Sequence, residues 1–324
     1  MYEFINFLKV IATILITNAH YENIYPISII ANGGLLGDVL FFVVSGFCLS
    51  NIKGSFIKWY KKRIIRIYPT VFIVTLICIF AGLYVYENSL HGFISMFIYP
   101  TNYHFVASII ILYVFYYLIL SLIKKIGINK RRGILVSMIF ILIIYLIYYF
   151  FMFDKSFYHI DSVYENNIRF FFLICMLLGA WIKEKLSYYK SKKNKYIFLI
   201  IGVLFVIYVI SKVLFSKVDI LAPIQILNQI ILFGLLYFIF ITTLSYEDKL
   251  VLLPEYIRKT IKYISNLTLE IYLIQYLLID RLNKFAFPIN FIIVSFSILI
   301  SAFLIKLFIS QMNKKLTNIY EVRK

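Results

Sequence analysis

The stretch "FINFLKVIATILITNAH" (residues 4–20) decides the fold class. It has the length of a membrane-spanning helix, because about 17–25 apolar residues cross the hydrocarbon core of a bilayer. Lys9 nevertheless stands near its middle and His20 at its end. Ionisable side chains within a span usually face the interior of a helix bundle or a wet cavity. The stretch therefore predicts a membrane helix whose polar side chains serve a function.

The composition of the whole chain agrees with a membrane environment. The chain is 62% hydrophobic and 15% charged, whereas soluble domains are about 45–50% apolar and about 25% charged. Cys48, Cys78 and Cys175 are isolated in apolar runs, so they predict neither a metal site nor a disulfide framework. Lys9 interrupts the first apolar run and no small-residue cleavage site follows, so we expect this helix to be retained rather than cleaved as a signal peptide.

Ten apolar stretches have the length of a span, and we expect all of them to be helices because lipid offers no partner for an unpaired backbone group. They cover residues 4–20, 35–50, 67–86, 106–123, 134–151, 166–182, 196–214, 223–243, 263–281 and 289–309. The sequence thus predicts an all-α bundle of about ten transmembrane helices. We expect a single transmembrane domain over residues 1–324, with no soluble domain.

The distribution of basic residues orients this bundle. Residues 51–66, 124–132, 183–195, 245–262 and 310–324 hold 25 of the 33 Lys and Arg. Positive loops stay in the cytoplasm, so both termini are predicted to be cytoplasmic. The net charge of +18 is then a topological feature that also attracts lipid headgroups, and it predicts no nucleic-acid partner. The Lys-, Ile-, Asn- and Tyr-rich usage suggests an AT-rich bacterial genome, so we expect the protein in the plasma membrane of a bacterium.

The first helix carries a polar stripe. Asn6, Lys9, Thr13, Thr17 and His20 are spaced three or four residues apart, which places them on one helix face. Lys9 and His20 are separated by about 16 Å along the axis. The simpler alternative is that Lys9 extends to the headgroups and His20 lies at the interface.

Two further stretches follow. In "GDVLFFVVSGFCLS" (residues 37–50), Asp38 enters the second span at about the depth of His20, and Ser45 and Gly46 allow another backbone or a ligand to approach. Arg63 and Arg66 then lie on one face at the cytoplasmic mouth of the third span. Paired arginines suit phosphate, because each guanidinium offers a rigid fork of donors. Ordinary positive-inside flanking explains them equally well.

These three stretches together resemble the acyltransferase-3 family of multipass membrane acyltransferases. The family has a basic residue, ten residues and then a histidine, which correspond here to Lys9 and His20, with lysine where arginine is more frequent. Its "G-x-D-x-FF-x-x-SGF" stretch is similar to "GDVLFFVVSGF", in which Asp38 directly follows its glycine. Its "R-x-x-R-I-x-P" stretch is similar to "RIIRIYP" (residues 63–69).

The resemblance weakens toward the C-terminus. "SNLTLEIYLIQ" (residues 265–275) is similar to a late helix in which the family often has histidine where Gln275 stands here. Glu270 in this stretch lies at nearly the depth of Lys9, counted from the cytoplasmic side. A buried carboxylate is costly unless it is paired, so we expect an ion pair between Lys9 and Glu270, with a tyrosine, an asparagine or water as the alternative partner.

The resemblance implies transfer of an acetyl or other acyl group from acyl-CoA to a hydroxyl of a surface or lipid-linked glycan. His20 would be the base, because the pKa of histidine suits proton transfer near neutral pH, and Asp38 would orient it. Lys9, Arg63 and Arg66 would bind the donor, with Glu270, Ser45 and Gly46 in support. We expect acetyl-CoA or another acyl-CoA as a substrate and no bound cofactor.

Several alternatives stay open at this point. A transporter or flippase for a lipid-linked or small polar substrate would equally use ten helices and a polar intramembrane track, and a structural or sensory protein is a third class. The acceptor, the acyl length, a covalent acyl-histidine and the oligomeric state are not determined by the sequence. Six other polar residues are expected as interfacial caps, sugar ligands or solvent-exposed histidines: Gln225, Asn228, Gln229, His91, His104 and His159.

Overall fold

The computed structural model describes residues 2–162, 165–191, 195–282 and 284–322, and no strand occurs within these ranges. The elements are α1 (Glu3–Ala19), η1 (Ser28–Ile30), α2 (Gly34–Leu49), α3 (Phe56–Phe80), α4 (Leu90–Phe93), η2 (Ile94–Ile98), α5 (His104–Ile126), α6 (Lys130–Phe151), α7 (Asn167–Lys183), α8 (Leu186–Ser191), α9 (Ile197–Lys217), η3 (Asp219–Ile224), α10 (Ile226–Ser245), α11 (Glu247–Val251), α12 (Glu255–Asn266), α13 (Thr268–Leu282) and α14 (Ile289–Val322).

The predicted all-helical class is confirmed, and each of the ten predicted stretches coincides with a helix. In the described part of the chain, seven helical segments are long and apolar enough to cross a membrane: Ser28–Leu49, Phe56–Phe80, His104–Ile126, Lys130–Phe151, Ile197–Lys217, Ile226–Ser245 and Ile289–Lys314. The other three, α1, α7 and α13, have only 17, 17 and 15 residues. The count of ten spans and the cytoplasmic termini therefore stay predictions.

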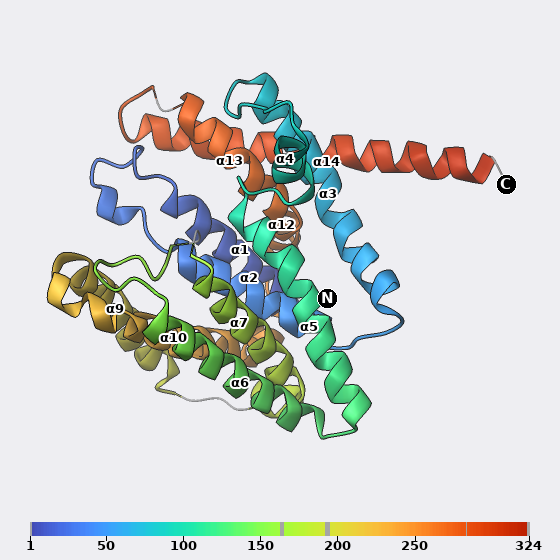
Figure 1. The fold of residues 1–324 in the computed structure, drawn as a ribbon. Helices are drawn as coiled ribbons and strands as arrows, with labels where there is room; N and C mark the ends of the chain where they lie inside the picture. Colours follow the sequence, from blue (N-terminus) through green and yellow to red (C-terminus); the bar gives the residue numbers. More distant parts are fainter. Residues whose placement is uncertain (1, 163–164, 192–194, 283, 323–324) are drawn as a thin grey trace.

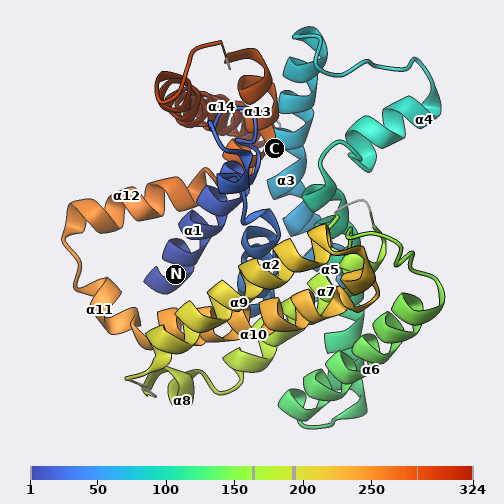
Figure 2. The same ribbon diagram turned by 90° about the vertical axis from the view of Figure 1, so that its left-hand side faces the viewer.

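The centre of the bundle is formed by α1, α2 and α7 (Figures 1 and 2). Contact between α2 and α7 is close because both helices carry glycine where they meet. A Cβ on Gly46 would lie 1.8 Å from the carbonyl oxygen of Met176, and one on Gly179 would lie 2.0 Å from that of Val43. The expectation that Gly46 lets another backbone approach is thus met by α7. Phe42 stacks on Phe172 beside this contact, with ring centroids 4.2 Å apart.

A second group of helices packs around α13. The buried side chains of Val74 in α3, Ile271 in α13 and Ile298 in α14 belong to one apolar cluster, which Ile16 joins from α1. The main cluster gathers α1, α2, α5, α7 and α10 instead. Helix α1 thus lies between the two groups, so side chains on its different faces meet different helices. Figure 1 shows α14 continuing well beyond the bundle toward the C-terminus.

Two helix boundaries differ from the sequence prediction. Helix α3 begins at Phe56, eleven residues before the predicted 67, because Trp59 is buried and anchors its first turn against Tyr113 and Tyr117. Much of the basic stretch 51–66 is therefore helical. Residues 255–266, counted within a basic loop and the start of the next span, form the separate helix α12. This helix has charged residues on one face and apolar residues on the other, as helices at a membrane interface do.

Replacing Gly46 with alanine is expected to destabilise the protein. The added methyl group would meet the α7 backbone, which cannot move aside as a flexible side chain would, and overpacking of a tight core costs about 1–3 kcal/mol. Thermal unfolding in detergent should show a clear drop in Tm. Gly202→Ala in α9 is the matched control, since nothing lies within 4 Å of its Cβ position. Equal melting of both variants would contradict the close α2–α7 contact.

Candidate active site

A cavity of about 700 Å³ lies where α1 ends and α2 and α5 begin, and both His20 and Asp38 line it. His20 directly follows the last residue of α1, so the helix presents it at the mouth of the bundle. Asp38 lies in the second turn of α2 and is only 8% exposed. The structure thus brings together the two residues that the sequence placed at similar depth.

The two side chains are not hydrogen bonded to each other. The His20 ring instead packs edge to face on Tyr276, with ring centroids 4.8 Å apart. The expectation that Asp38 orients His20 directly is therefore not met in this structure. Both side chains instead line the same cavity, His20 from the end of α1 and Asp38 from α2. A small group of a bound ligand can therefore lie between them.

Three residues that line the cavity were not predicted as site residues, because no local sequence pattern marks them. Tyr272 and Tyr276 come from α13, and their rings meet edge to face at 5.8 Å, which gives the cavity an aromatic wall. His104 was expected in solvent, but it begins α5, is only partly exposed and lines the cavity. The expectation of solvent exposure holds for His91.

One wall of the cavity is held by a polar anchor at the start of α10, defined here as Gln225, Asn228 and Gln229. Gln225 accepts hydrogen bonds from the backbone N–H groups of His159 and Ile160 at 2.9 Å each. Gln229 donates to the carbonyl of Ile160, and Asn228 donates to that of Tyr208. These buried amides are neither interfacial caps nor sugar ligands, because their hydrogen bonds are used to hold the preceding loop.

The anchored loop contributes charge to the cavity. Asp161 follows it directly and forms an ion pair with Lys212 of α9 at 2.7 Å, and both residues line the cavity. His159 is also fixed rather than solvated, because its ring is stacked between Phe153 and Phe157 at 4.4 and 4.3 Å. The expected exposure of His159 is therefore wrong.

A second site lies deeper along α1. Lys9, Arg66, Lys183 and Lys306, called here the basic cluster, come from four helices that are distant in sequence. Lys9 lies close enough to Arg66 and Lys306 for their charges to interact, and Cys48 lies within the same reach of Lys9, Arg66 and Lys183. The sequence analysis counted Lys183 among the basic residues of a cytoplasmic loop. Its neighbours in the chain do not indicate that it lies near Cys48.

The two arginines of α3 have different environments. The guanidinium of Arg63 lies over the ring of Trp59 at 4.2 Å and donates to the carbonyl of Trp59 at 2.6 Å. Arg66 is exposed, and no hydrogen bond or ion pair joins its side chain to another described residue. Arg66 is therefore the arginine of the pair that is available to a ligand, while Arg63 is largely engaged by its own helix.

The ion pair predicted between Lys9 and Glu270 is wrong. Glu270 is fully buried, and its Oε1 pairs with Lys306 Nζ of α14 at 2.8 Å. The hydroxyl of Thr70 in α3 also donates to this oxygen at 3.4 Å. Glu270 therefore joins α13, α3 and α14, and among the described residues no carboxylate forms an ion pair with Lys9.

The polar stripe of α1 divides into separate roles. Asn6 is buried, donates to Glu3 and accepts from Ser265, so it fixes the start of α1 against α12. The hydroxyl of Thr13 donates to the carbonyl of Lys9 within the helix. Only Lys9 and His20 face the two sites described above. Gln275 is buried, has no hydrogen-bond partner among the described residues and does not line the cavity.

The amino-acid sequence matches the model of a known family. The Acyl_transf_3 model, an acyltransferase domain, matches residues 2–311, which is nearly the whole chain. The chain belongs to the acyltransferase-3 family. The resemblance noted in the three N-terminal stretches is thereby confirmed, and this acyltransferase-3 protein is a multipass membrane protein. No curated protein and no solved structure matches it significantly.

Proposed function

We propose that this acyltransferase-3 protein transfers an acetyl or other short acyl group from acyl-CoA to a hydroxyl of a cell-surface or lipid-linked glycan in the bacterial plasma membrane. The proposal rests on one observation: α1 carries a cavity with a histidine at its end and a cluster of basic side chains deeper along the helix. The cavity with His20 and Asp38 lies at the end of the helix, and the basic cluster with Lys9 lies about 16 Å away along its axis.

The cavity suits a sugar hydroxyl. Aromatic side chains such as Tyr272 and Tyr276 combine apolar faces with polar tips, which complements a pyranose ring and its hydroxyl groups. Asp161 and Lys212 add polar groups at the same cavity wall. A site of about 700 Å³ falls within the range of small-molecule sites, roughly 300–1,000 Å³.

The reaction follows from these positions. His20 takes the proton of the acceptor hydroxyl as its oxygen attacks the carbonyl carbon of the thioester. The C–O bond forms, the C–S bond breaks, and the thiolate of CoA leaves and regains a proton. Asp38 faces the same cavity and stabilises the imidazolium electrostatically without touching it. The basic cluster binds the phosphates of the donor, which is made in the cytoplasm.

Arg66→Ala is expected to raise the apparent KM for acyl-CoA about ten- to a hundredfold, because charge-assisted contacts are worth roughly 1.5–3 kcal/mol. The KM for the acceptor should change little. Lys62→Ala, which removes a neighbouring exposed charge, is the control. Steady-state kinetics in proteoliposomes measure both constants. If Arg66→Ala and Lys62→Ala give the same donor KM as the parent protein, the arginine has only a topological role.

A direct assay tests the proposal as a whole. Purified protein in liposomes should release free CoA thiol from acetyl-CoA only when a glycan acceptor is present. NMR of surface glycans should show ester-linked acyl groups that disappear when the gene is deleted. A transporter would move its substrate without cleaving a thioester, so substrate movement with no thiol release would overturn the proposal.

A further inference from the structure

We propose that this protein has a specific binding site for the headgroup of an anionic phospholipid, separate from the active site and from the basic cluster. The site is a cavity of about 410 Å³ at the end of the bundle where α6 and α9 begin and α7 and α10 end. Arg131, Lys185, Tyr188, Tyr189 and Tyr237 provide its polar lining. Neither the proposed reaction nor the family motifs use any of these residues.

Among the residues that the structure describes, no carboxylate forms an ion pair with Arg131 or Lys185, the two cations of this cavity. Within the described ranges, the nearby acids are engaged elsewhere: Glu184 pairs with Lys130 at 2.7 Å, and Asp248 pairs with Lys190 at 2.7 Å. In the same part of the chain, Arg131 lies over the ring of Trp181 and Lys185 over that of Tyr188. An anion that enters the cavity would therefore meet two positive charges with no competing carboxylate.

The guanidinium of Arg131 is held ready for such an anion. It lies 4.0 Å above the ring of Trp181, which fixes its plane. Its Nε is buried and has no hydrogen-bond acceptor among the described residues. A buried N–H without an acceptor is costly, and the planar fork of arginine matches the oxygens of a phosphate. A phosphate group would supply the missing acceptor.

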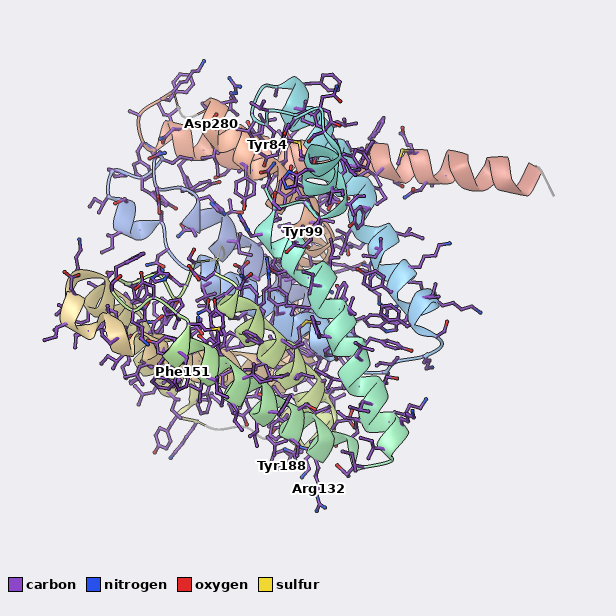
Figure 3. All side chains as sticks on the ribbon, viewed as in Figure 1. Tyr84, Tyr99, Arg132, Phe151, Tyr188 and Asp280 are labelled. Atoms are coloured by element: carbon purple, nitrogen blue, oxygen red, sulfur yellow. The ribbon has the colours of Figure 1, made fainter. Side chains whose placement is uncertain are left out.

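Aromatic residues complete the headgroup site. Tyr188 and Tyr189 meet edge to face at 5.2 Å, and Tyr237 packs on Tyr189 at 6.4 Å. Tyrosine at a membrane interface combines an apolar body with a hydroxyl that can donate to a headgroup oxygen. Figure 3 labels Tyr188 and Arg132, the neighbour of Arg131, at this same end of the molecule.

The remaining wall favours a lipid over a soluble phosphate. Ile197, Phe238 and Ile241 line the cavity with apolar surface. The next residues of α9, Phe198 and Leu199, are 60% and 66% exposed and continue this surface outward along a membrane-spanning helix. A headgroup bound at Arg131 could thus extend its acyl chains along α9, whereas a soluble phosphate would leave this surface uncovered. Basic pockets between helices at a membrane surface are typical binding sites of anionic lipids.

The test uses the delipidated full-length protein in neutral detergent, titrated with phosphatidylglycerol or phosphatidylcholine and observed by native mass spectrometry. Phosphatidylglycerol should bind tightly and phosphatidylcholine weakly. Each Lys or Arg near an anionic lipid contributes about fivefold in affinity, so Arg131→Gln/Lys185→Gln should bind phosphatidylglycerol about thirtyfold more weakly. Lys185→Gln alone, at an exposed side chain that folding does not require, should lose about fivefold.

The control is Arg132→Gln/Lys125→Gln, which removes the same number of charges from exposed positions outside the cavity. This variant should keep the affinity of the parent protein within about twofold. An equal loss in both double variants would reduce the effect to general surface charge and overturn the site. Full competition by adenosine 3′,5′-bisphosphate would also overturn the lipid assignment, because the ligand would then be a soluble phosphate.

Discussion

Replacing His20 with alanine is expected to abolish acyl transfer while leaving insertion and folding intact. General base catalysis contributes about 10²–10⁴-fold in rate. The other histidine that lines the cavity, His104, begins α5 and therefore comes from a different element. His20 follows the helix end, and its ring packs edge to face on Tyr276 without a side-chain hydrogen bond to any described residue, so its loss removes little packing. The rate of CoA thiol release in the presence of acceptor measures the effect.

His91→Ala serves as the matched control, because His91 is exposed and lies outside the cavity. The binding of acyl-CoA should be unchanged in His20→Ala, since the basic cluster is untouched. If His20→Ala transfers acyl groups at the rate of the parent protein, histidine is not the base. A loss of donor binding equal to the loss of rate would assign His20 to binding instead of catalysis.

Lys306→Met is expected to destabilise the protein strongly. It would leave the fully buried carboxylate of Glu270 with only the long hydrogen bond from Thr70, and removal of one partner from a buried pair costs about 3–5 kcal/mol. Glu270→Gln should cost less, because the Lys306 side chain is 47% exposed and can turn toward headgroups or solvent. Thermal unfolding in detergent compares the variants.

The double variant Lys306→Met/Glu270→Gln should recover most of the stability lost in Lys306→Met, since no charge is then left unpaired. Pairs in contact usually show coupling of about 0.5–3 kcal/mol, so losses that simply add would mean that the two residues do not interact. Lys9→Met distinguishes the two possible partners of Glu270. It should melt near the parent protein and raise the KM for acyl-CoA, because Lys9 belongs to the basic cluster.

Much of the candidate site could be predicted because its main residues lie on one short segment. His20 and Asp38 are only 18 residues apart, at the end of α1 and in the second turn of α2, and hydropathy alone places them at similar depth. The predicted role of Gly46 also followed from local reasoning, since a glycine in a bulky helix indicates close approach. The structure adds that α7 is the helix that approaches.

Other parts of the site depend on contacts across long sequence separations. Lys306 is 36 residues from Glu270, whereas Lys9 lies at the opposite end of the chain, and depth alone cannot choose between them. The polar anchor likewise depends on distant residues, because Gln225 accepts hydrogen bonds from the backbone N–H groups of Ile160 and His159, 65 and 66 residues away. A pattern of polar residues near a span end indicates that they need partners but not which ones.

The sequence by itself determined the environment, the helical class, the family and the identity of the first catalytic candidates. These properties depend on local quantities: apolar length, charge density, helical periodicity and the spacing of residues within short motifs. The tertiary structure alone decided which cation neutralises Glu270, which arginine of α3 is available, and which tyrosines wall the cavity. The physical reason is that a membrane helix must bury its polar groups against neighbours, and the rotation and pairing of helices select those neighbours only when the whole bundle packs.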